Sequence, residues 1–234
     1  MRKSVDNWDA IAQWWKDEVA TDPVYRDDIA PMLNRLIAAP SAPILELGCG
    51  DGQWLRWLGS DRGQVVGCDR SAHLLRGVVA DHPVAVCELP SLNWLSDDAI
   101  GAAYSVFVLD LIADEAAFFA EAARVVRTGG ELVVIINHPI FTAPNSGPFM
   151  DPDLDVFWRW GAYLDHGASD VPAGSQTVTM FHRPVGDLLT AAADSGWRLE
   201  EAIESPLGAA AIEREPSYRG QEGIPRFLGM RWRR

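Results

Sequence analysis

Three glycines that alternate along one short segment are the residues best placed to bind a ligand. Gly48, Gly50 and Gly52 follow the apolar run Ile44–Leu47, and a predicted helix begins directly after them. Glycine adopts positive φ angles and lets a ligand approach the backbone closely. The helix that follows presents unpaired N–H groups and a positive dipole end. The segment therefore predicts a strand, a tight turn and a helix that can hold a polar or anionic group.

The spacing of these glycines distinguishes between two nucleotide cofactors. A dinucleotide fingerprint, G-x-G-x-x-G, needs a glycine at position 53, where this chain has Gln53. The observed G-x-G-x-G, with Glu46 two residues before the first glycine, resembles the first motif of the class I S-adenosylmethionine-dependent methyltransferases. A ligand-free turn between strand and helix in another α/β fold is the alternative.

A carboxylate follows the next predicted strand, residues 64–68. Asp69 lies 17 residues after Gly52, and a carboxylate at such a strand end can accept hydrogen bonds from both ribose hydroxyls. Residues 66–71 (VGCDRS) look like the ribose-binding motif of the same family. Asp69 could instead cap a helix, although Ser71 is better placed for that role.

The resemblance extends over two further strands. Residues 84–90 look like the segment that lines the adenine, although Glu88 could equally be a solvated loop acid. Residues 105–110 and 124–130 (RVVRTGG) resemble the fourth strand and the turn into the fifth, but Thr128 replaces the usual proline and Gly101 the usual aspartate. The resemblance implies S-adenosyl-L-methionine as the cofactor, with contacts from Glu46, Gly48, Cys49, Gly50, Gly52, Asp69, Arg70, Glu88, Leu89 and Ser105.

The elements that must position these residues alternate between strand and helix. Apolar runs at 44–47, 64–68, 84–87, 102–109 and 131–136 alternate with predicted helices, which indicates βαβ units on a parallel sheet. The family resemblance implies an α/β, Rossmann-like three-layer αβα sandwich with seven strands in the order 3-2-1-4-5-7-6. The last strand, residues 227–232, is then antiparallel to the rest.

The N-terminal segment predicts a helical cap, and an internal segment predicts a lid. Trp8, Ile11, Trp15 and Val19 recur at helical spacing, and a second helix is expected over 23–38, so residues 1–40 predict a helical cap. Residues 41–234 form the predicted methyltransferase domain. Its segment at about 137–180, rich in proline and aromatic residues, is expected to be an irregular substrate lid.

Methyl transfer from a sulfonium is an in-line displacement in which the protein mainly orients the acceptor and excludes water. The acceptor should bind beyond the carboxyl ends of the strands. Trp15, Tyr25, Trp158 and Tyr163 are the predicted substrate contacts, and they suit an aromatic or apolar small molecule. His138, directly after the fifth strand, is the candidate catalytic base. Any of these side chains could instead be structural.

Composition limits the partners. Thirty-three acidic against 20 basic residues give a net charge of −13, which disfavours nucleic acid as a partner. Three cysteines with no C-x-x-C pair suggest neither a disulfide framework nor a metal site. The N-terminus has no apolar run that resembles a signal peptide, and no apolar run is long enough to span a membrane, so we expect a cytoplasmic protein that does not bind membranes. We also expect a monomer or a homodimer.

Three other functions remain compatible with the sequence. A protein of this fold can bind the cofactor while catalysing a different reaction, such as a cyclisation. It can also be a binding or regulatory module without turnover. A nicotinamide-dependent dehydrogenase is disfavoured by the missing third glycine.

Overall fold

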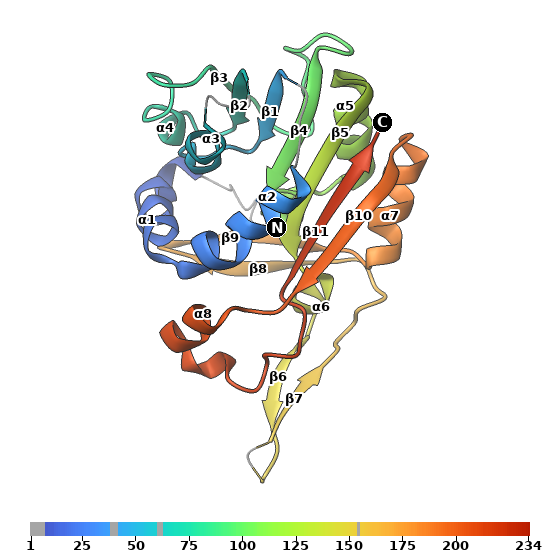
Figure 1. Cartoon of the computed structure of the whole chain (residues 1–234). Helices are drawn as coiled ribbons and strands as arrows, with labels where there is room; N and C mark the ends of the chain where they lie inside the picture. Colours follow the sequence, from blue (N-terminus) through green and yellow to red (C-terminus); the bar gives the residue numbers. More distant parts are fainter. Residues whose placement is uncertain (1–7, 38–41, 60–62, 154) are drawn as a thin grey trace, which may run out of the picture.

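A seven-stranded sheet forms the centre of the computed structural model, which describes residues 8–37, 42–59, 63–153 and 155–234 (Figure 1). Only β11 runs antiparallel to its neighbours, β5 and β10. The other pairs are parallel. The predicted order and the antiparallel last strand are therefore confirmed. Across the sheet the strands are β3 (Val84–Val86), β2 (Val65–Asp69), β1 (Ile44–Leu47), β4 (Ile100–Val106), β5 (Val126–Asn137), β11 (Phe227–Arg233) and β10 (Arg198–Ser205).

Helices cover both faces of this sheet, which makes the three-layer sandwich. Successive side chains of a strand point to opposite faces. In β5, Val133 and Ile135 pack in a cluster with the side chains of α2 and α3, whereas Leu132, Val134 and Ile136 pack with those of α5 and α7. Burial on both faces explains why the central strands are almost wholly apolar. The covering helices are α2 (Ala30–Leu36), α3 (Gln53–Leu58), α4 (Ala72–Leu75), α5 (Glu115–Val125) and α7 (Val185–Asp194).

The N-terminal helix α1 (Trp8–Thr21) lies against the carboxyl edge of the sheet, where the carboxylate of Asp9 connects it to the start of α4. Asp9 Oδ1 accepts hydrogen bonds from Ser71 Oγ at 2.5 Å and from the backbone N–H of His73 at 3.1 Å. The expected helix started at residue 4, but residues 4–7 lie outside the described part of the chain. The second expected helix is a π-helical turn, η1 (Tyr25–Ile29), that continues into α2; its predicted last residue, 38, also lies outside the described part.

The segment at 137–180 is not irregular, and this expectation was wrong. A short helix, α6 (Pro139–Thr142), is followed by two antiparallel hairpins. Proline inside a strand normally argues against it, and Pro148 and Pro172 both lie within these short strands, which concealed them. The hairpins are β6 (Gly147–Met150) with β7 (Val156–Arg159), and β8 (Gly167–Ala173) with β9 (Gln176–His182).

The two hairpins occupy different places (Figure 1). The β8–β9 hairpin crosses the carboxyl edge of the sheet, where β8 contacts α1 and β9 contacts the 3₁₀ turn η3 (Leu109–Leu111). The β6–β7 hairpin projects away from the sheet, and its Phe149 and Phe157 rings stack 5.6 Å apart on an exposed face. Only the second hairpin is therefore positioned to cover a site.

A further segment at this edge was not predicted. Between β10 and β11 the chain forms α8 (Ala209–Arg214) and the 3₁₀ turn η4 (Pro216–Tyr218). In Figure 1 this segment lies beyond the carboxyl ends of β4 and β5, near α1. Among the described residues, no helix is long and apolar enough to cross a bilayer.

The loop after β4 is held by a buried arginine between β9 and α7. Arg183 donates from Nε to Glu115 Oε2 at 2.7 Å and from Nη1 to the Leu109 carbonyl at 3.2 Å. Its Nη2 donates to the Ile112 carbonyl. The side chain is only 4% exposed, so these partners replace water around the charge. Arg183 thereby fixes the loop 109–112 against the β8–β9 hairpin.

We expect Arg183→Met to lower the free energy of unfolding by about 3 kcal/mol, because it leaves Glu115 and two carbonyls without their donor. Urea unfolding followed by circular dichroism measures the change. Arg127→Met is the matched control, since Arg127 is exposed in β5, and it should cost less than about 0.5 kcal/mol. Equal losses in the two variants would contradict this role of Arg183.

Candidate functional site

The glycine turn after β1 has the geometry that only glycine adopts readily. Gly48, Gly50 and Gly52 have φ angles of +77°, +53° and +80°. A Cβ on Gly48 would lie 2.4 Å from a methyl group of Val108, and one on Gly52 would lie 2.8 Å from a methyl group of Val78. The turn therefore requires glycine both for its backbone angles and for close packing.

Asp69, at the end of β2, organises this turn. Its Oδ2 accepts a hydrogen bond from the Gly50 N–H at 2.9 Å, and its Oδ1 accepts one from the Ser71 N–H at 2.8 Å. Burial raises the pKa of Asp69, and these two N–H groups oppose that rise. Ser71 caps α4 by accepting from the Leu74 N–H, as the sequence predicted for that residue.

A first cavity, which we call the glycine-loop cavity, opens beside Asp69. Its volume of about 360 Å³ is within the range of small-molecule sites, about 300–1,000 Å³. It extends from α1 across the carboxyl ends of β1, β2 and β4 to the loop after β3. Six of the ten predicted cofactor residues line it: Gly48, Gly50, Asp69, Arg70, Glu88 and Leu89.

The other four predicted cofactor residues lie outside the lining of this cavity. Glu46 is buried in β1, where its Oε2 accepts a hydrogen bond from the Tyr104 hydroxyl at 2.9 Å and burial raises its pKa well above the usual value. Cys49 is also buried, Gly52 begins α3, and Ser105 is buried in β4. These four residues are placed to support the turn from within the protein.

A second cavity, which we call the aromatic cavity, adjoins the first. It has a volume of about 470 Å³ and lies between α1, η1, the β8–β9 hairpin, α8 and the start of β11. Four residues belong to the linings of both cavities: Trp8, Trp15, Phe107 and Leu111. These four side chains therefore separate the two cavities and can contact a ligand in either one.

Aromatic rings form a continuous series along this shared boundary. The Trp15 and Tyr25 rings are 6.2 Å apart, Tyr25 and Phe107 are 6.0 Å apart, and Phe107 and Phe227 are 5.8 Å apart. Trp8 meets Trp15 edge-on at 5.5 Å. The Phe107–Phe227 pair is tilted, and the other three contacts are edge-to-face, a geometry that aromatic pairs prefer. The boundary is thus a preformed apolar wall.

The structure brings two of the four predicted substrate residues to the aromatic cavity. Trp15 and Tyr25 line it. Trp158, on β7, packs against Phe141 with the ring centres 4.3 Å apart. Tyr163 accepts a hydrogen bond from the Val185 N–H through its hydroxyl, at 3.3 Å. Neither Trp158 nor Tyr163 lines either cavity, because the β6–β7 hairpin and the chain after it lead away from the site.

His138 is placed away from both cavities. It is 6% exposed, its Nδ1 accepts from the Ile140 N–H at 3.2 Å as the cap of α6, and its Nε2 lies 2.8 Å from Glu204 Oε1. Burial lowers the pKa of His138, and Glu204 opposes that shift. Both ring nitrogens therefore have partners within the protein. Among the described residues, no histidine lines either cavity.

Sequence analysis missed a polar network at the far side of the aromatic cavity. Asp110 Oδ2 accepts from both the backbone N–H and the Nδ2 of Asn137, at 3.1 and 3.0 Å. Arg226 Nη1 donates to Asn137 Oδ1 at 2.6 Å. Burial raises the pKa of Asp110 to about 6. Three isolated residues from distant segments leave no local pattern, so no sequence signal could have joined them.

The described residues contain no group of three histidine, cysteine or acidic side chains that could hold a metal ion. All three cysteines are free: Cys49 and Cys68 are buried, and the partly buried Cys87 lines the glycine-loop cavity.

Known methyltransferases resemble this chain in sequence and in fold. Residues 45–134 match the family model described as a methyltransferase domain. A solved S-adenosylmethionine-dependent methyltransferase from Mesorhizobium loti is 29% identical, with a TM-score of 0.76 over 88% of this chain and 96% of that one. The geranyl diphosphate C-methyltransferase from Streptomyces coelicolor A3(2) shares the fold at 16% identity, with a TM-score of 0.62 over 98% and 99% of the two chains.

One curated relative is an uncharacterized 37.1 kDa protein in transposon TN4556 of Streptomyces fradiae. It is 36% identical over 126 residues, which are 50% of this chain and 36% of that protein. The chain thus matches only about a third of the length of that relative. The glycine turn and the strands around it match a methyltransferase domain over residues 45–134, and the chain has the fold of a solved S-adenosylmethionine-dependent methyltransferase over 88% of its length.

Proposed function

We propose that this protein transfers the methyl group of S-adenosylmethionine to a small, flat or apolar molecule and releases S-adenosylhomocysteine. The observation that carries the proposal is the boundary shared by the glycine-loop cavity and the aromatic cavity, formed by Trp8, Trp15, Phe107 and Leu111. A donor and an acceptor in two adjoining cavities can meet without leaving the protein. Helix α1, the β8–β9 hairpin and α8 then act as the cap over the acceptor.

The residues of the glycine-loop cavity fit the cofactor. Asp69 offers carboxylate oxygens for the ribose hydroxyls, and the bare backbone at Gly48 and Gly50 admits the methionine portion. Arg70 and Glu88, an exposed ion pair 3.4 Å apart, lie with Leu89 at the adenine side. When bound, the cofactor supplies an electrophilic methyl group on a sulfonium.

The chain's own contribution is mainly to orient the acceptor and to exclude water. Burial raises the pKa of Tyr25, so its hydroxyl stays neutral and can donate a hydrogen bond in the aromatic cavity. His138 is too enclosed to serve as the base. The site therefore suits an acceptor whose reacting atom needs no proton removed by a histidine.

The size of the aromatic cavity supports a small acceptor. A volume of about 470 Å³ accommodates a molecule of two or three fused rings rather than a protein loop or a nucleic acid strand. The Streptomyces coelicolor enzyme of the same fold acts on geranyl diphosphate, which is also a small molecule. The net charge of −13 adds to the case against nucleic acid.

Calorimetric titration with S-adenosylhomocysteine tests the cofactor assignment. We expect Asp69→Ala to weaken binding at least tenfold, about 1.4 kcal/mol, because the ribose hydroxyls lose their acceptor and Gly50 loses its restraint. Asp51→Ala is the matched control: Asp51 lies in the same turn but outside the cavity lining, so its change should stay within about twofold.

Thermal melting of both variants separates loss of binding from loss of folding. NADH is titrated in parallel and should not bind. Binding of NADH but not of S-adenosylhomocysteine by the wild type would replace the methyltransferase proposal with a dehydrogenase. Unchanged affinity in folded Asp69→Ala would remove Asp69 from the site.

The aromatic cavity is tested with 2-naphthol as a flat apolar probe, titrated in the presence of saturating S-adenosylhomocysteine. Trp14 lines the aromatic cavity but not the glycine-loop cavity. Trp14→Ala should therefore weaken binding of 2-naphthol by about tenfold and change the affinity for S-adenosylhomocysteine by no more than about twofold. Trp57→Ala is the matched control, since Trp57 is 38% exposed and is not among the residues that line either cavity. Equal effects of the two substitutions would contradict acceptor binding in this cavity.

A further inference from the structure

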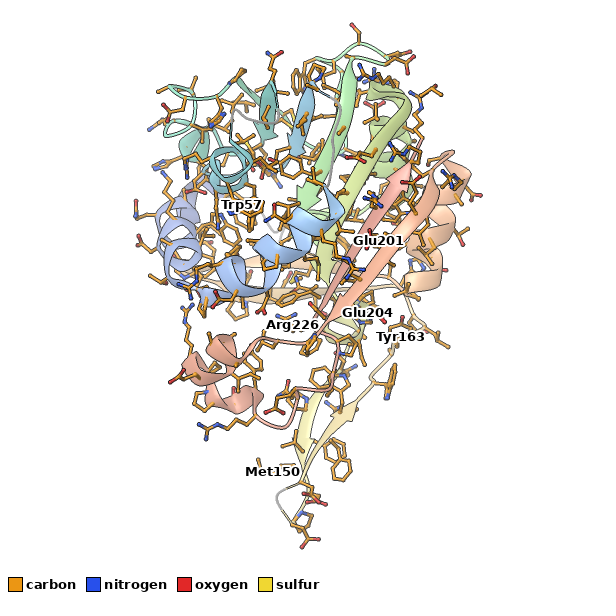
Figure 2. The ribbon with its side chains drawn as sticks, viewed as in Figure 1. Trp57, Met150, Tyr163, Glu201, Glu204 and Arg226 are labelled. Carbon is orange, nitrogen blue, oxygen red and sulfur yellow. The ribbon has the colours of Figure 1, made fainter. Side chains whose placement is uncertain are left out.

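One cationic side chain in the aromatic cavity has no counter-ion in direct contact. Arg226 immediately precedes β11 at the carboxyl edge of the sheet and lines the aromatic cavity but not the glycine-loop cavity. Figure 2 places it at the end of the sheet, on the side of the segment that carries α8. None of the sequence motifs includes it.

Two aromatic rings and one amide hold the guanidinium. Its carbon lies 4.5 Å from the ring centre of Phe141 and 5.4 Å from that of Phe227. Nη1 donates to Asn137 Oδ1, and the opposite amide group of Asn137 donates to Asp110. The nearest carboxylate in this network is therefore reached only through a neutral amide.

The remaining edge of the guanidinium lacks acceptors. Nε is fully enclosed and has no hydrogen-bond partner, and Nη2 makes no hydrogen bond to any residue that the structure describes. A buried donor without a partner costs about 1–3 kcal/mol, and more when the group is charged. Burial lowers the pKa of Arg226, but a guanidinium stays protonated at neutral pH.

The other charges around the aromatic cavity are already matched. Arg214 pairs with Glu18 at 3.1 Å and with Asp22 at 3.4 Å. Glu215 accepts hydrogen bonds from the N–H and the hydroxyl of Ser217. Of the two arginines among the described lining residues, Arg226 alone has no carboxylate within ion-pair distance. It is the one cation there that is available to a ligand.

We propose that Arg226 binds a carboxylate of the acceptor, so that the methylated molecule is an aromatic or apolar carboxylic acid; this assignment rests on the methyltransferase function proposed above. A carboxylate carries one negative charge, which one guanidinium neutralises, and one of its oxygens can accept a charge-assisted hydrogen bond from Nη2. A phosphate carries nearly two negative charges, which is more than the single unpaired guanidinium of this cavity neutralises.

The position of Arg226 implies that the carboxylate anchors the acceptor and is not itself the group that is methylated. Phe227 lies next to Arg226, and its ring contacts Phe107 on the boundary between the two cavities. An acceptor held at Arg226 therefore extends its apolar body along Phe227 towards the boundary. The atom that receives the methyl group lies at the end of the molecule distant from the carboxylate.

Calorimetry with a matched pair of probes tests this assignment. With S-adenosylhomocysteine bound, 2-naphthoate should bind the wild type at least tenfold more tightly than the neutral 2-naphthamide, because only the former pairs with the guanidinium. Arg226→Gln should abolish that preference, and Arg226→Lys should retain at least threefold. Arg127→Gln, which removes an exposed arginine outside both cavity linings, should keep the full preference.

Three results would overturn the assignment. They are equal affinity of the two probes for the wild type, no binding of either probe, and a preference that survives in Arg226→Gln. Tighter binding of 2-naphthyl phosphate than of 2-naphthoate would exclude the carboxylate in favour of a phosphate. The titration of S-adenosylhomocysteine separates the two proposals. If the wild type does not bind it, the methyltransferase function itself is contradicted. If the wild type binds it but shows no preference for 2-naphthoate, only the role of Arg226 is contradicted.

Discussion

The carboxylate of Asp69 links the parts of the protein that form the two cavities. It accepts from Gly50 in the glycine turn and from Ser71 at the start of α4. The hydroxyl of Ser71 in turn donates to Asp9, which holds α1 against the sheet. Helix α1 carries Trp8 and Trp15, the two tryptophans that line both cavities. One short chain of hydrogen bonds therefore connects the glycine turn to the wall that the two cavities share.

The environment changes steadily from one end of the combined site to the other. Backbone N–H groups and a carboxylate lie at the glycine-loop cavity, and aromatic rings from Trp8 to Phe227 follow them. A guanidinium lies at the far end. A neutral apolar acceptor would leave that charge uncompensated, whereas an acid would match it. This arrangement explains how specificity can come from one polar contact within an otherwise apolar cavity.

The sequence predicted the features that depend on neighbouring residues. The glycine turn and the cap at Ser71 follow from short motifs, because a turn and the strand before it are set by adjacent side chains. The strand order came from the family resemblance that these motifs carry. Features that depend on distant segments were missed or misplaced. His138 follows β5 as expected, but Glu204 and α6 enclose it, and Trp158 lies on a hairpin whose proline concealed its strand. Arg226 becomes notable only through its contacts with Asn137 and Phe141.

A crystal structure of the protein with S-adenosylhomocysteine and 2-naphthoate would test the central claim that donor and acceptor meet at the boundary of the two cavities. The account predicts the ribose hydroxyls within hydrogen-bond distance of Asp69, the sulfur facing the boundary at Trp15 and Phe107, and the naphthoate ring in the aromatic cavity. A sulfur atom that faces away from the aromatic cavity, or a nucleoside bound outside the glycine-loop cavity, would contradict it.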